Sequence, residues 1–366
     1  GYGVWGLGLA PIQLVFVNGH YSRELSSLRS LPEGVKVGSL AAILNADPGR
    51  VEPYLARYAS FQEQAFVALN TAFMEDGAFI DIPPGKVMEG PIHLLFVSTA
   101  SREPIVSHPR SLIIVGASSQ VTIVESYVGL ESGLYFTNGV SEIVAGENAV
   151  IDHYKLELES EQAFHMATMQ ALLDRSSNFT SHSVALGGAL VRNELNAVLD
   201  GEGGECTLNG LYMVTGRRHV DNQTRIDHVR PHCISRELYK GILDGQSRGV
   251  FNGKIYVHKH AQKTDARQVN KNLLLSEDAV IDTKPQLEIY NNDVKCSHGS
   301  TIGQLDQDSL FYLRTRGMDL ESARSLLTYA FTSEMISRIR VEPIRAQLEH
   351  LFTARLQNGL QPGDMP

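Results

Sequence analysis

The sequence has 366 residues, of which 43% are hydrophobic and 20% charged, as in an ordinary soluble globular protein. The formal net charge of −9 argues against nucleic acid as the main partner, and apolar runs such as Ile92–Val97 are too short to span a bilayer. Three widely spaced cysteines, Cys206, Cys233 and Cys296, suit a reducing compartment and argue against a self-contained zinc or four-cysteine cluster site.

Residues 1–78 are predicted to form a mixed, partly helical region. Leu14–Asn18 is a short apolar run followed by a turn at Gly19, as expected of a strand. Val51–Met74 carries apolar residues at three- and four-residue steps and is rich in Ala, Gln and Glu. This spacing predicts one helix that ends near Asp76–Gly77.

Residues 79–317 change character, with short β-branched and aromatic runs separated by polar turns. Turn sequences begin at residues 116, 146, 176 and 203, and less regular ones follow at 244 and 276. A repeat of about thirty residues favours a β-solenoid, although an antiparallel sandwich is the alternative. The predicted strands include Ile92–Val97, Ser111–Val115, Val121–Tyr127, Val150–Leu158, Glu205–Val214, Gly249–His258, Asn272–Leu275 and Pro285–Tyr290.

Residues 318–366 are predicted to be helical. Asp319 can cap a helix whose apolar stripe runs from Leu320 to Met335, and a second amphipathic helix follows over Ile344–Leu356. Because a solenoid end exposes unpaired strand edges, these two helices could cap it, or they could form a docking surface.

Two pairs of side chains could bind a metal. In a strand, Cys296 and His298 point to the same side about 7 Å apart, and a thiolate with an imidazole can bind iron or zinc. Two ligands do not complete a site. The same sequence is also expected for a buried cysteine beside a surface histidine that bind no metal. His258 and His260 form a weaker candidate pair, because Lys259 raises the local positive charge.

Other catalytic signatures are sparse. The sequence has no GxxxxGK[ST] phosphate loop, no GxSxG and no HExxH. Asp221, Asp227 and Asp244 could serve a polysaccharide-cleaving β-helix, provided that the fold gathers them in one groove.

One long stretch is similar to a known family. Asp244–Lys254 (DGQSRGVFNGK), Asp282–Ile289, Asp293–Gly299 and Leu310–Gly317 follow, in order, the pattern of the SufB/SufD family of iron–sulfur cluster assembly proteins. Gly90–Val97 extends the resemblance upstream. Within the family the chain resembles the SufD form, because Lys295–Gly299 lacks the acidic Glu-His-Glu of SufB and Asn270 stands where SufB has a cysteine.

The resemblance implies a mainly β protein: a right-handed parallel β-helix with N-terminal and C-terminal helical regions. It implies a scaffold subunit without an activity of its own, which pairs with SufB and docks the SufC ATPase through the C-terminal helices. Cys296 and His298 would be its share of a transient iron or Fe–S site at the interface, with no cofactor held tightly by this chain alone. The expected location is the bacterial cytoplasm or the plastid stroma. A β-helical polysaccharide-acting enzyme and a homo-oligomeric structural protein are the alternatives, and the isolated chain could form a homodimer.

Overall fold

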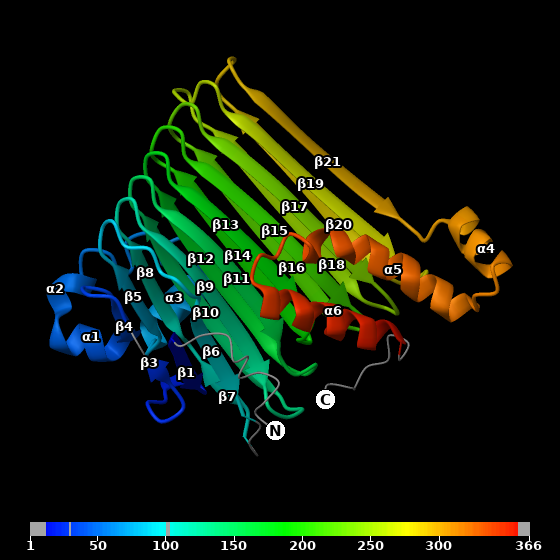
Figure 1. Ribbon diagram of the computed structural model, residues 1–366, viewed down its shortest axis with the longest axis horizontal. Helices are drawn as coiled ribbons and strands as arrows, with labels where there is room; N and C mark the ends of the chain where they lie inside the picture. Colours follow the sequence, from blue (N-terminus) through cyan, green and yellow to red (C-terminus); the bar gives the residue numbers. More distant parts are fainter. Residues whose placement is uncertain (1–11, 29–30, 100–102, 358–366) are drawn as a thin grey trace.

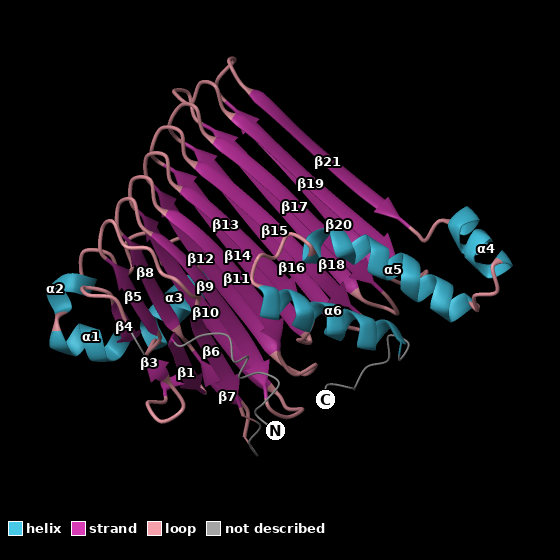
Figure 2. Cartoon of the chain, viewed as in Figure 1, coloured by secondary structure: helices cyan, strands magenta, loops and turns pink. Residues whose placement is uncertain are grey.

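The computed structural model describes residues 12–28, 31–99 and 103–357. The chain is a parallel β-solenoid of about 8 turns with helices near both ends, which confirms the predicted fold class (Figure 1). Consecutive long strands alternate between two sheets, so that each coil contributes one strand to each sheet (Figure 2). Among the described residues, no helix has the length and apolar character needed to cross a membrane.

The strands form an eleven-stranded and a ten-stranded sheet. The eleven-stranded sheet contains β1 (Ile12–Val17), β2 (His20–Tyr21), β3 (Ser27–Leu28), β6 (Ile92–Ser98), β9 (Gln120–Gly129), β11 (Val150–Leu158), β13 (Asn178–Ala185), β15 (Glu205–Val214), β17 (Ile234–Leu243), β19 (Asp265–Leu274) and β21 (Lys295–Gly303). The ten-stranded sheet contains β4 (Lys36–Ser39), β5 (Ala78–Ile82), β7 (Ile105–Ser107), β8 (Arg110–Val115), β10 (Tyr135–Ala145), β12 (Phe164–Leu173), β14 (Leu190–Leu199), β16 (His219–His228), β18 (Arg248–Val257) and β20 (Val280–Ile289).

The turns along one edge of the solenoid stack on one another. At the same place in successive coils, one residue has a positive φ, and its N–H donates to a carbonyl of the next turn, as Asn148 does to Arg175 at 2.8 Å. Most of these residues are not glycine, so the stacking itself stabilises the left-handed conformation. They are Ser118, Asn148, Ser176, Gly203, His232 and Lys263.

Two apolar layers hold the molecule together. One fills the inside of the solenoid between the two sheets. The other lies between the outer face of the eleven-stranded sheet and the C-terminal helices α5 (Leu320–Ile336) and α6 (Glu342–Gln357) (Figure 1). Asp319 caps α5 as predicted, and its carboxylate accepts the N–H of Ser322 at 2.9 Å.

Of the two alternatives for these helices, capping of the open end is not what the described residues show. They lie along the side of the eleven-stranded sheet. In the described part of the chain, β20 and β21, the last strands of the ten- and the eleven-stranded sheet, remain uncovered at the end of the solenoid (Figure 1). The outward side chains of the sheet explain this, because Tyr154 and Leu156 of β11 present an apolar outer face for the helices. A further helix, α4 (Gln307–Thr315), begins within the stretch predicted as solenoid core and leads away from β21.

The single helix predicted over Val51–Met74 is also wrong. The structure has α1 (Leu40–Ala46), α2 (Pro48–Val51) and α3 (Ala65–Phe73), with turns between α2 and α3. Pro53 lacks the N–H that a helix needs, and Ala56 has a positive φ of 58°. The backbone N–H groups of Ala56, Tyr58 and Ala59 donate to a buried carboxylate on β10 instead of forming helical bonds.

Candidate functional site

The last coil carries the predicted Cys296–His298 pair on the edge strand β21. Both residues lie in a strand and on its inward side, because Cys296 pairs with the buried Ala266 and His298 with the buried Gln268. The predicted alternation is therefore correct. No further coil follows among the described residues, so these inward positions are open to solvent at the end of the solenoid.

The two side chains differ in environment. Cys296 is half-buried and packs against an apolar cluster that includes Ile255 and Val257. This burial raises the pKa of its thiol, which keeps the thiol protonated in the isolated chain. His298 is exposed. Within the described residues, no three His, Cys, Asp or Glu side chains gather to hold a metal ion, so the pair is incomplete by itself.

The second predicted pair lies elsewhere. His258 and His260 follow the end of β18 in a turn, where strand alternation does not apply. The Nε2 atom of His258 lies 3.6 Å from Oδ1 of Asp227, and the ring packs edge-on against Tyr256. His260 is exposed.

The acids considered for polysaccharide cleavage do not favour that alternative. Asp221 and Asp227 lie on the outer side of β16, where they form ion pairs with Arg192 and Arg225. Asp244 lies in a turn on a different side of the solenoid.

At the open end, apolar side chains are exposed at positions that are buried in the preceding coil. Ile289 is 39% and Ile302 48% exposed, although their partners in the preceding coil, Val257 and Asn272, are buried. The Thr283 and Ser300 hydroxyls lie 2.9 Å apart across this last coil. An uncovered edge strand beside exposed core positions is the type of surface that another strand can extend.

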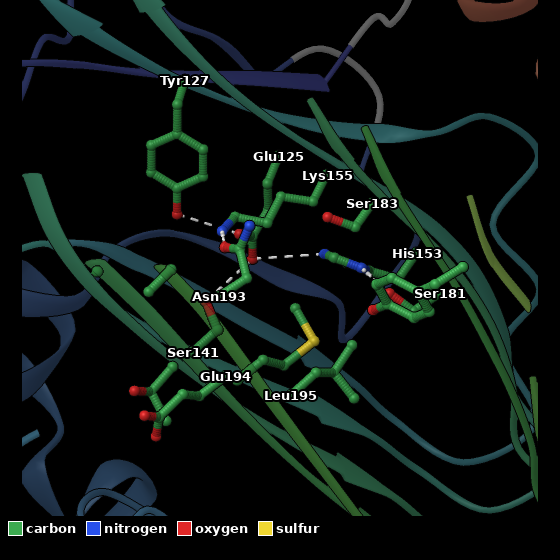
Figure 3. A pocket seen from close by; sticks show the side chains of 15 residues that line it. Glu125, Tyr127, Ser141, His153, Lys155, Ser181, Ser183, Asn193, Glu194 and Leu195 are labelled. Atoms are coloured by element: carbon green, nitrogen blue, oxygen red, sulfur yellow. Dashed lines mark hydrogen bonds and ion pairs between the residues drawn. The ribbon is translucent and has the colours of Figure 1, made fainter. Parts of the chain in front are cut away.

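A polar cluster inside the solenoid was missed by sequence reasoning. Figure 3 shows Lys155 and His153 of β11 pointing toward Glu125 and Asn193, around a cavity large enough for a water molecule. The Lys155 Nζ lies 2.5 Å from the Glu157 carboxylate and 2.6 Å from the Asn193 amide oxygen. The groups of this cluster are buried and bind one another, which indicates a structural role.

The charges in this cluster shift one another's pKa values. Burial opposes ionisation of Glu157, but Lys155 and His165 outweigh it and hold the carboxyl pKa well below its usual range. Burial likewise opposes a charged His165, yet Glu159 and Glu157 raise its pKa. The signal available in the sequence was the polar alternation of His153, Lys155 and Glu157 in β11.

A second missed group lies closer to the open end. Glu237 of β17 is fully buried, and burial raises its pKa to about 7, although the hydrogen bond from Gln268 and the nearby Thr224 hydroxyl oppose the rise. The Nε2 of Gln268 donates to its Oε2 at 2.7 Å. Glu237, Gln268 and His298 occupy consecutive positions of one inward column.

Comparisons with known proteins agree with this architecture. Residues 96–331 match the family model "SUF system FeS cluster assembly, SufBD core domain", and residues 8–94 match "SufBD protein N-terminal region". A SufBD family protein of Synechocystis is 36% identical over 94% of this chain and 77% of its own length. SufD of Escherichia coli is 33% identical over 96% of the chain and 81% of its own length, and the chloroplastic protein ABCI7 of Arabidopsis is 33% identical over 91% and 71%. The chain therefore belongs to the SufB/SufD family of iron–sulfur cluster assembly proteins.

Proposed function

We propose that the chain is a non-catalytic scaffold subunit of the SufD type, which pairs through its open solenoid end with a SufB-type subunit. The observation that carries this proposal is the uncovered last coil, where Ile289 and Ile302 stay exposed beside the edge strand β21. A partner strand added to β21 would pair its free backbone groups and bury both isoleucines. Iron or a nascent cluster is the cargo held between the two subunits.

Cys296 and His298 supply this chain's share of that site. A thiolate and an imidazole suit iron, and the remaining ligands come from the partner subunit. Metal binding must displace the Cys296 proton, whose removal is opposed by burial. Because two ligands do not complete a site, we expect the chain alone to hold no cluster tightly. The relatives SufD of Escherichia coli and chloroplastic ABCI7 support a bacterial cytoplasmic or plastid location.

The C-terminal helices dock the SufC-type ATPase. Phe311 and Tyr312 of α4 are 71% and 57% exposed, and α4 leads away from the solenoid. Such exposed aromatic side chains are common anchors of protein interfaces. The sequence lacks a phosphate loop, so ATP hydrolysis is assigned to the partner.

Pairing is tested by co-expression with SufB and SufC homologues. Ile302→Asp is expected to abolish capture of the SufB-type subunit, and also any homodimer that the isolated chain forms through this edge. Val106→Asp is the matched control, because Val106 is 55% exposed but lies on β7, at the other end of the solenoid. Normal pairing by Ile302→Asp, or equal loss in both variants, would refute the proposed interface.

The ATPase contact is tested separately. Replacing both Phe311 and Tyr312 with Ala is expected to remove the SufC-type subunit while the SufB-type subunit still co-purifies. Loss of neither subunit would contradict docking through α4.

A further inference from the structure

The inside of the solenoid becomes polar near the open end. β19 turns Gln268, Asn270 and Asn272 inward, and each is at most 3% exposed. Asn272 accepts the Tyr212 hydroxyl at 2.8 Å and donates to the Asn270 oxygen at 2.6 Å, while the Asn270 nitrogen donates to a backbone carbonyl. These two amides are satisfied within the core, but Gln268 is not.

Gln268 has one partnered and one unpartnered side-chain atom. Its Nε2 donates to Glu237 Oε2, and an ionised carboxylate can only accept, so the amide nitrogen faces Glu237. The amide packs closely against Gly253 of β18 on the opposite sheet. A Cβ at position 253 would lie only 2.3 Å from the Gln268 Nε2 atom, so there is no room for a larger residue. The Oε1 atom has no partner, although Gln268 is fully buried. Leaving a buried amide oxygen unpaired costs free energy, which requires an explanation.

The neighbour of Gln268 on the open side is His298. The two residues are register partners in β19 and β21, so their backbones are one strand spacing apart, about 4.8 Å, and both side chains point inward. The His298 ring forms no hydrogen bond with the described residues. An imidazole and a free carbonyl oxygen thus belong to neighbouring residues of one inward column.

We propose that Gln268 is a positioning residue for His298: its Oε1 accepts one ring N–H and leaves the other ring nitrogen, unprotonated, directed at the open end. The metal-binding part of this inference rests on the proposed function. A histidine ligand must present a lone pair, and a hydrogen bond to its other nitrogen fixes the tautomer and the ring orientation. Glu237 acts on His298 indirectly. By accepting the Nε2 hydrogen bond, it orients the Gln268 amide so that Oε1 faces His298.

The hydrogen bond is tested on the isolated chain, without metal or partner. The chain is labelled with 15N-histidine and studied by NMR at pH 8, where Glu237 is ionised, and His298→Gln assigns the His298 signals. We expect the wild-type ring to favour one tautomer by about tenfold, as one net hydrogen bond allows. In Gln268→Met, which keeps the length but removes the acceptor, the ring should approach the mixture of free histidine.

Two further variants make the result specific. Glu237→Gln should also weaken the tautomer preference, since the new amide can donate to Gln268 Oε1 and turn the Gln268 amide. Unchanged signals of the buried His93 and His228 show in the same spectra that the solenoid is intact. An unchanged His298 tautomer in both variants, with those signals intact, would overturn the proposal.

A second measurement separates this inference from the proposed function. In the complex with SufB and SufC homologues, Co²⁺ alone serves as the probe, and Gln268→Met should lower its affinity about 10- to 100-fold. If His298→Ala leaves Co²⁺ binding unchanged, the proposed site fails whatever the NMR result. If His298→Ala abolishes binding but Gln268→Met changes neither affinity nor tautomer, the site stands and the positioning role is refuted.

Discussion

The carboxylate of Glu142 provides the sharpest test of how the N-terminal region is held. Its Oε1 accepts the N–H groups of Tyr58 and Ala59 at 2.9 and 3.0 Å, and its Oε2 accepts that of Ala56 at 2.8 Å. Oε2 also lies 2.6 Å from Arg110 Nη2, and both side chains of this ion pair are fully buried. One carboxylate thus fixes the segment between α2 and α3 to the solenoid.

Glu142→Gln keeps the shape but removes the charge and turns one acceptor atom into a donor. Because Arg110 would remain buried without its counter-charge, we expect the free energy of unfolding to fall by about 3–5 kcal/mol. Urea unfolding measures this loss, and trypsin should cut faster at the exposed Arg57 in the loosened segment. Glu147→Gln, which breaks the exposed pair with Arg175, is the control and should cost about 1 kcal/mol or less. A loss no larger than the control's, with normal trypsin resistance, would refute the reasoning.

Three other predictions concern buried side chains that can ionise. Lys240→Met removes the Nζ bonds to Glu334 and to the Phe331 carbonyl, at 2.6 and 2.9 Å, and should speed hydrogen exchange in α5 but not in the solenoid strands. Unchanged exchange in α5 would contradict this anchoring role. The Glu237 pKa is raised from 4.5 to about 7, so its favourable effect on stability is present below pH 4.5 and lost as the pH rises through 7. Between pH 4.5 and pH 8, the free energy of unfolding of Glu237→Gln should therefore rise relative to that of the wild type by up to about 3 kcal/mol. Equal pH dependence of the two proteins in urea unfolding would contradict this. Burial lowers the His182 pKa from 6.5 to about 4, so its contribution to stability is present above pH 6.5 and lost as the pH falls toward 4. In His182→Phe, the free energy of unfolding should depend less on pH between 6.5 and 4 than in the wild type. An unchanged pH dependence in this range would contradict the prediction.

The solenoid was predictable because each coil repeats a strand and a polar turn. The predicted strands Val150–Leu158 and Glu205–Val214 have the bounds of β11 and β15. The irregular spacing of the turns has a simple cause: those at 116, 146, 176 and 203 lie on one edge of the solenoid, whereas those at 244 and 276 lie on another. Sequence spacing does not distinguish the two edges.

The polar interior was not predictable from alternation. In β11 the polar His153 and Lys155 point into the solenoid, while Tyr154 and Leu156 point outward to the C-terminal helices. Both faces of this sheet are covered, so hydrophobicity does not identify which side is inside. For the same reason the pattern did not reveal that the helices cover a side of the solenoid and leave its end open.

The candidate site was predictable only in part. Alternation correctly placed Cys296 and His298 on one side of a strand, because that inference needs only local geometry. The role of Gln268 depends on strand register across thirty residues, which local sequence does not reveal. The remaining ligands lie, in our proposal, on another chain.

The central claim is that His298 binds iron or a nascent cluster at the interface with a SufB-type subunit. Its most direct test is the iron and sulfide content of the complex, purified anaerobically after co-expression with SufB and SufC homologues. We predict that His298→Ala still assembles with both partners but loses iron and sulfide, whereas His260→Ala, which changes an exposed histidine in a turn, retains both. A His298→Ala complex with the wild-type content of iron and sulfide would contradict the account.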